Sequence, residues 1–163
     1  MCPNNGYIMA DGMRKTFKNL HNNHRLNLVN QLVPNGNSGT KLRSGSKMME
    51  IKYNCEAEKT AFEWAKQCID ADSPASSRRN WAENRYTFPN KNLDLMTVAT
   101  RMAWDTHEHI GCAIYHCPSF INAVCHYGPA GQFGAGKQIY KPGPKCNRCG
   151  TVGATCFGGL CRR

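Results

Sequence analysis

The stretch IGCAIYHCPSFINAVCHY, residues 110–127, decides the fold. Its two halves, residues 110–117 and 120–127, have the alternation and the β-branched content of strands, and Pro118 and Ser119 separate them. Two runs with a period of two residues around a short turn are typical of a β-hairpin. The sequence therefore predicts an antiparallel hairpin here.

Two helices are predicted upstream of this hairpin. Residues 13–33 place apolar side chains at helical spacing and end at Pro34. Residues 55–68 form a second, amphipathic pattern, in which Asn54 is placed to cap the first turn and Glu58 is expected to face solvent. A loop rich in Gly, Asn and Ser connects the two segments.

Cysteine content indicates the environment of the protein. An even set of ten, spread along the chain, is typical of five disulfides in a secreted protein. The last four, C-x2-C-x6-C-x4-C, could also hold zinc, and Cys146 with Cys149 could be a redox pair, but no βαβ pattern surrounds them. The Gly-rich segment around them is too small for a core of its own, so we expect a disulfide-held knot.

The net charge is +10 over 163 residues. Such a field attracts sulfated glycans, anionic lipid or acidic proteins, although it also serves plain solubility. The basic clusters are short and lack interleaved aromatic residues, so no nucleic-acid partner is expected. No apolar run approaches the roughly 20 residues that cross a bilayer, so we expect a soluble protein without membrane insertion. No signal peptide follows Met1, which predicts a mature or recombinant N-terminus.

Catalytic and metal-binding patterns are weak. His107 and His109 would share one strand face, but two imidazoles are at most half of a tetrahedral zinc site, and His116 lies seven residues further on. No serine lies in a G-x-S-x-G motif, and only Asp72 and Glu83 remain as a carboxylate pair. We therefore expect no enzyme activity and no cofactor.

Five segments together resemble the CAP superfamily, which comprises the sperm-coating, cysteine-rich secretory and pathogenesis-related proteins. Within it, the chain looks most similar to nematode activation-associated secreted proteins, including the hookworm anti-adhesive members. The segments, in order, are LHNNHR (20–25), CEAEKTAFEWAKQC (55–68), WAENRY (81–86), RMAWDTHEHIGCAIYHC (101–117) and AVCHYGPAGQ (123–132).

The resemblance implies an α+β fold, a three-layer α-β-α sandwich with a short cysteine-rich C-terminal hinge. The corresponding domains are a CAP domain at residues 1–140 and a hinge-like tail at residues 141–163. The resemblance also implies a disulfide map, in which Cys2 and Cys55 are left to pair with each other. The other implied pairs are Cys68 with Cys117, Cys112 with Cys125, Cys146 with Cys156, and Cys149 with Cys161.

CAP proteins often carry two histidines and two glutamates in a central cleft that binds a divalent metal. Here Asp72 and Val98 stand at the two histidine positions, and Glu83 keeps one glutamate. The second glutamate belongs to a helix between Tyr86 and Val98, where the chain is roughly thirty residues short of the family length. Either that helix is absent or its residues were omitted from a renumbered chain. The degenerate cleft predicts no metal site.

The function implied by the resemblance is that of a secreted, non-enzymatic parasite effector. It would bind a host cell-surface protein such as an integrin and inhibit platelet or leukocyte adhesion. The chain has no Arg-Gly-Asp or Lys-Gly-Asp sequence, so recognition would use a folded surface. Arg78, Arg79 and Arg85 are candidates for it, and glycosaminoglycan capture could accompany it. The alternative is an extracellular sterol or lipid carrier.

Overall fold

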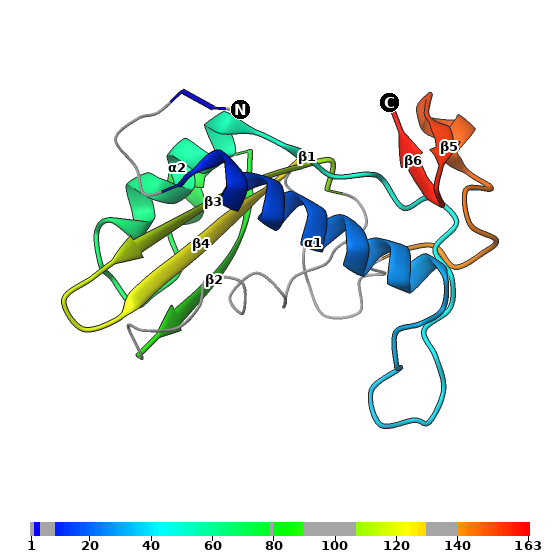
Figure 1. The fold of residues 1–163 in the computed structure, drawn as a ribbon, viewed down its shortest axis with the longest axis horizontal. Helices are drawn as coiled ribbons and strands as arrows, with labels where there is room; N and C mark the ends of the chain where they lie inside the picture. The colour runs from blue at the N-terminus through cyan, green and yellow to red at the C-terminus, as the bar shows by residue number, and fades with distance from the viewer. Residues whose placement is uncertain (1, 4–8, 79, 90–106, 130–139) are drawn as a thin grey trace. The chain divides into compact units, whose positions relative to one another are not determined.

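The chain folds into two compact units (Figure 1). The computed structural model describes residues 2–3, 9–78, 80–89, 107–129 and 140–163. Unit 1 comprises Met1–Leu20, Ile51–Met102 and His107–Gly131, and unit 2 comprises His21–Glu50, Ala103–Thr106 and Gln132–Arg163. Residues 141–163 thus share a unit with residues 21–50, and the domain boundary at residue 140 stays a prediction. Among the described helices, none has the length and apolar character that crossing a membrane requires.

Unit 1 is built on a four-stranded sheet with the strand order β1-β3-β4-β2. Strands β3 and β4 form the antiparallel hairpin that the sequence predicts, and that prediction is confirmed. Strand β2 pairs antiparallel with the other edge of β4, and β1 adds to β3 in parallel. The strands are β1 (Lys52–Tyr53), β2 (Ala82–Phe88), β3 (His109–His116) and β4 (Ile121–Gly128).

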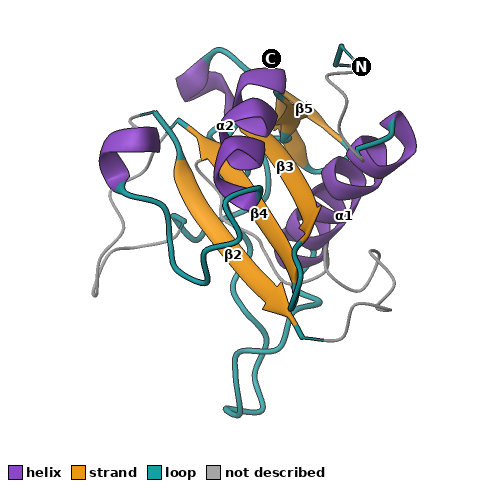
Figure 2. Ribbon diagram, turned by 90° about the vertical axis from the view of Figure 1, so that its left-hand side faces the viewer, coloured by secondary structure: helices purple, strands orange, loops and turns teal. Residues whose placement is uncertain are grey.

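Helices cover both faces of this sheet. Helix α2 (Cys55–Ala65) lies over β3 and β4 (Figure 2) and packs Ala61 against Ala113 and Val124. Because side chains alternate along a strand, Ile114 faces the other side. There it joins a core with Phe17 of helix α1 (Asp11–Val29). The order helix, sheet, helix is the expected three-layer sandwich.

Gly111 of β3 sets the spacing between the sheet and α2. A Cβ atom at this position would lie 2.1 Å from the backbone nitrogen of Glu58 and 2.6 Å from the carbonyl oxygen of Asn54. Asn54 caps the helix as predicted, because its side-chain oxygen accepts the N–H of Ala57 at 2.9 Å. The first turn of α2 therefore rests directly on the backbone of the strand. The helix ends three residues before Cys68, which adopts a positive φ of 55°.

The expectation that Glu58 faces solvent was wrong. Its side chain is 2% exposed and pairs with Arg14, which is equally buried, at 2.7 Å between Oε1 and Nη2. A second bond joins Arg14 Nε to Glu58 Oε2 at 2.7 Å, and the hydroxyl of Tyr53 donates to the same oxygen at 2.5 Å. Hydrogen bonding to Glu58 raises the pKa of Arg14, and burial followed by Glu58 raises the pKa of Tyr53. Glu58 can be buried here because its negative charge is paired with the guanidinium of Arg14.

Unit 2 combines the second half of α1 with the C-terminal hairpin. Strands β5 (Thr155–Phe157) and β6 (Leu160–Arg162) are antiparallel, and Gly158 and Gly159 between them both have positive φ. A 3-10 helix, Cys149–Val152, precedes the hairpin. Leu160 packs with Val29 and Met48, so the knot completes its core with residues from earlier in the chain.

Helix α1 ends at Val29, earlier than the predicted residue 33. Gln31 adopts a left-handed φ of 58°, which turns two backbone N–H groups back toward the helix. The N–H of Gln31 bonds Leu28 O at 2.9 Å, and the N–H of Leu32 bonds Asn27 O at 2.8 Å. This arrangement is a Schellman cap, and it stops the helix before Pro34 is reached.

Five disulfides join all ten cysteines, and no cysteine is free. The pairs are the same as those that the resemblance implies. The four C-terminal cysteines therefore form two disulfides, and not the zinc knot or the Cys146–Cys149 redox pair that the sequence also allowed. The bonds are Cys2–Cys55, Cys68–Cys117 and Cys112–Cys125 in unit 1, and Cys146–Cys156 and Cys149–Cys161 in unit 2.

Candidate functional site

The three residues predicted to mark a degenerate cleft have different environments. Asp72 lies in the segment after α2, with its side chain 79% exposed, and its Oδ1 is 3.6 Å from Nε of Arg85. Glu83 lies on β2, and its side chain is only 1% exposed. Val98 lies outside the described residues. The structure therefore gives Asp72 and Glu83 separate partners.

Glu83 is the centre of a buried hydrogen-bond network in unit 1. Its Oε2 is 2.9 Å from Nε2 of His126, and its Oε1 accepts the backbone N–H of Ser73 at 2.7 Å. The other imidazole nitrogen of His126, Nδ1, is 2.7 Å from the hydroxyl of Thr60 on α2. Glu83 and His126 meet because they are register partners on β2 and β4. The partner of the Glu83 carboxylate is therefore His126 and not Asp72, with which the sequence analysis paired it.

The charge state of Glu83 fixes the direction of these hydrogen bonds. Burial by itself raises the pKa of this carboxyl, but hydrogen bonds from His126 and Ser73 outweigh it and lower the pKa below its ordinary value. An ionised carboxylate only accepts hydrogen bonds, so His126 donates its Nε2–H. When the imidazole is neutral, its Nδ1 accepts the hydroxyl hydrogen of Thr60.

A hydroxyl, an imidazole and a carboxylate in this order resemble a catalytic triad. The position of Thr60 argues against that role. Its hydroxyl lies inside the helix, 3.2 Å from Glu56 O and 3.1 Å from Ala57 O. These carbonyls compete with His126 for the single hydroxyl hydrogen, because threonines in helices commonly bond them. The network is better described as a clamp that joins α2, β2, β4 and the segment at Ser73.

A metal site needs more ligands than this network offers. Among the residues that the structure describes, no group of three or more His, Cys, Asp or Glu side chains is arranged to hold a metal ion. Glu83 and His126 already bond each other. His107, one of the two histidines weighed as zinc ligands, is buried and stacks on Tyr127 with ring centroids 5.2 Å apart.

The predicted basic surface is partly neutralised. Arg78 donates to Ser73 Oγ at 2.9 Å and lies 3.9 Å from Glu83. Arg85 donates to Asp70 at 2.8 Å, and Arg79 lies outside the described residues. Their role in binding stays a prediction. In the structure, Arg78 contacts the clamp at Ser73 and Glu83, whereas Arg85 pairs with Asp70 and Asp72.

The model of the cysteine-rich secretory protein family, CAP, matches residues 18–127. The chain belongs to the CAP family. It is 30% identical to the Ancylostoma secreted protein of Ancylostoma caninum over an alignment that covers 98% of this chain but 46% of that protein, so it spans less than half of that relative. That alignment extends over 199 residues, more than the 163 of this chain, so it contains gaps in this sequence.

Three other comparisons cover more of the relative. Hookworm platelet inhibitor 1 of Ancylostoma caninum is 31% identical over 90% of this chain and 77% of its own length. The crystal structure of NaASP2 with Zn2+ has a TM-score of 0.86 and 27% identity, covering 99% of this chain and all of that one. The crystal structure of hookworm platelet inhibitor has a TM-score of 0.76 at 27% identity, over 94% of this chain and 92% of that one. The CAP assignment thus agrees in sequence and in fold.

Proposed function

We propose that this CAP protein is a secreted, non-enzymatic effector of a parasitic nematode that binds a host cell-surface protein and inhibits the adhesion of platelets or leukocytes. The observation that carries the proposal is the similarity to hookworm platelet inhibitor 1, which extends over 77% of that protein. Five disulfides support secretion, because such crosslinks persist in oxidising compartments.

The receptor is proposed to be an integrin, recognised through a folded surface. Neither Arg-Gly-Asp nor Lys-Gly-Asp occurs in the sequence, so no short linear mimic of that kind is present. Disulfides in both units hold the loops that such a surface requires. A glycosaminoglycan at the host cell surface is proposed as an additional partner, because the net charge of +10 favours polyanions.

A non-enzymatic role is supported by the geometry of the Glu83 clamp. The imidazole of His126 bonds both the Glu83 carboxylate and the Thr60 hydroxyl, and the carbonyl of Ala57 lies 3.1 Å from the same hydroxyl, so every polar group of the network already has a partner inside the protein. Binding to a receptor requires a rigid surface and no reacting group.

Adhesion assays test this function directly. Folded protein is expected to reduce platelet or neutrophil attachment to fibrinogen or collagen. Reduced and alkylated protein, the matched control with the same sequence, is expected to have no effect, because opening the disulfides removes the folded surface. Failure of the folded protein to affect either cell type at micromolar dose would refute the proposal. Equal inhibition by the alkylated control would refute a folded recognition surface.

A further inference from the structure

The net charge is concentrated in unit 2. Its described residues, 21–50 and 140–163, hold nine Lys and Arg side chains and one acidic side chain, so they carry +8 of the net +10. The single acid, Glu50, is already bonded by Arg162 at 2.9 Å between Oε1 and Nη2. One of the nine cations, Arg25, is buried and donates to Met49 O. The remaining basic side chains create a strongly positive field that no acidic residue in the described part of the unit offsets.

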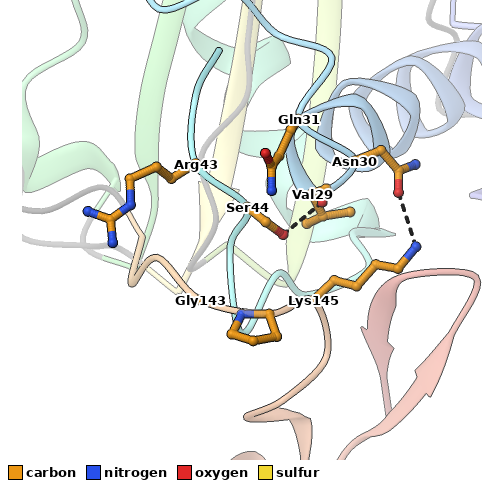
Figure 3. Close-up of a pocket in the computed structure, with 8 residues that line it drawn as sticks. Val29, Asn30, Gln31, Arg43, Ser44, Gly143 and Lys145 are labelled. Atoms are coloured by element: carbon orange, nitrogen blue, oxygen red, sulfur yellow. Dashed lines mark hydrogen bonds between the residues drawn. The ribbon is translucent and has the colours of Figure 1, made fainter. Parts of the chain in front are cut away.

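A cavity of about 520 Å³ opens in this positive unit. Figure 3 shows Arg43 and Lys145 at opposite ends of it, with Gln31 and Ser44 between them. Its volume lies within the usual range for small-ligand sites, about 300–1,000 Å³. The cavity therefore has a cation on each side and is large enough for a short segment of a polymer.

The C-terminal end of α1 lines this cavity, and its carbonyl groups are bonded in a way that reduces their repulsion of an anion. The last four carbonyls of a helix usually lack partners and carry a partial negative charge, which would repel an anion. Here each is bonded: Leu26 O by the N–H of Asn30, Asn27 O and Leu28 O by the Schellman cap, and Val29 O by the Ser44 hydroxyl at 2.7 Å. Lys145, which bonds Asn30 Oδ1 at 3.2 Å, adds a positive charge beside this helix end.

The lining combines cations with neutral polar groups. The guanidinium of Arg43 is exposed and makes no hydrogen bond or ion pair with any residue that the structure describes. The side chain of Gln31 offers an amide donor and an acceptor, and Val29 and Pro144 add apolar surface. Charged groups at both ends, with amide and apolar contacts between them, suit a saccharide that carries both anionic groups and hydroxyls.

We propose that this cavity binds a sulfated saccharide chain, with Arg43 and Lys145 contacting its anionic groups and Gln31 its hydroxyls. This inference rests on the glycosaminoglycan partner of the proposed function and assigns residues to it. A sulfated glycan fits because it is an extended polyanion of the extracellular space, where a protein with five disulfides is expected to act.

The test compares two double variants of the full chain on immobilised heparin and in calorimetry with a heparin oligosaccharide. Arg43→Gln with Lys145→Gln removes the two cavity cations. Lys41→Gln with Lys141→Gln removes the same charge from exposed positions of unit 2 outside the cavity. We expect the cavity variant to bind the oligosaccharide about tenfold more weakly than the control variant, because it loses two direct contacts as well as charge. All four positions are exposed, so unchanged melting temperatures show that both variants fold.

The outcomes separate the site from the proposed partner. Equal weakening by the two variants would overturn the cavity as the site and leave only general attraction by charge. No heparin binding by the unmodified protein would refute the glycosaminoglycan partner as well, while adhesion inhibition remains a separate measurement. Desulfated heparin is expected not to compete. Competition at equal potency by inorganic sulfate, by a polyglutamate peptide or by phosphatidylserine vesicles would overturn the assignment to a sulfated saccharide.

Discussion

Replacing Glu58 by Gln should destabilise unit 1 strongly. The substitution keeps the side-chain volume but removes the buried counter-charge of the Arg14 guanidinium, which is 2% exposed, and leaves it only the half-exposed carboxylate of Asp11, 2.8 Å away. Removing one partner of a buried ion pair typically costs about 3–5 kcal/mol of unfolding free energy. The Tyr53 hydroxyl also loses its carboxylate acceptor, although the amide oxygen of Gln can replace part of that bond. The expected cost is therefore about 3–5 kcal/mol, against a total stability of roughly 5–15 kcal/mol for a domain.

Thermal unfolding measures this cost. For a chain of this size, 1 kcal/mol corresponds to roughly 2–4 °C, so Tm should fall by about 6–20 °C. The matched control is Glu63→Gln, which removes an exposed i,i+3 partner of Lys66 and should change the free energy by about 0.5 kcal/mol or less. The double variant Arg14→Met with Glu58→Met should recover much of the loss, because it removes both charges together. A loss below about 1 kcal/mol for Glu58→Gln would refute the structural importance of this pair.

Three further predictions concern the clamp, metal and thiols. Because the pKa of Glu83 is lowered in the folded protein, its stabilising contribution is complete above the ordinary carboxyl value of 4.5 and is lost as pH falls through the folded pKa. Glu83→Gln should therefore lower Tm at pH 7 and flatten its decline in acid, and an unchanged acid slope would contradict the clamp. Zinc titration by calorimetry should show no site tighter than about 10 µM, equivalent to about 7 kcal/mol, and a stoichiometric submicromolar site would contradict the degenerate cleft. Mass spectrometry of native protein alkylated without reduction should show no modified cysteine, and two or more labelled thiols would contradict the disulfide map.

The elements that sequence predicted well depend on local patterns. The hairpin at residues 110–127 follows from a two-residue period. The cap at Asn54 follows from a side-chain acceptor placed just before the unpaired N–H groups of a helix start. The disulfide pairs came from the resemblance, because spacing by itself does not fix the connectivity of ten cysteines.

The features that sequence missed depend on contacts between distant residues. Glu58 lies on a helix with other charged residues, and only the position of Arg14, 44 residues earlier, makes burial favourable. The pairing of Glu83 with His126 needs the register of β2 on β4, which no local period specifies. Charge concentration in unit 2 was hidden for the same reason, because residues 21–50 and 140–163 are separate in the sequence.

The absence of a side chain at Gly111 determines how closely Glu58 and Arg14, the buried ion pair of unit 1, approach each other. With no Cβ at Gly111, the backbone of α2 at Glu58 approaches the strand more closely than any other residue type at this position permits. Alanine there would have to lift the start of α2, and the carboxylate of Glu58 would move with it away from the guanidinium of Arg14. The side chain at position 111, a single hydrogen atom, therefore sets the distance between the backbone of β3 and the start of α2. An uncharged substitution at position 111 would thus weaken the buried Arg14–Glu58 ion pair, because it increases the distance between the two backbones.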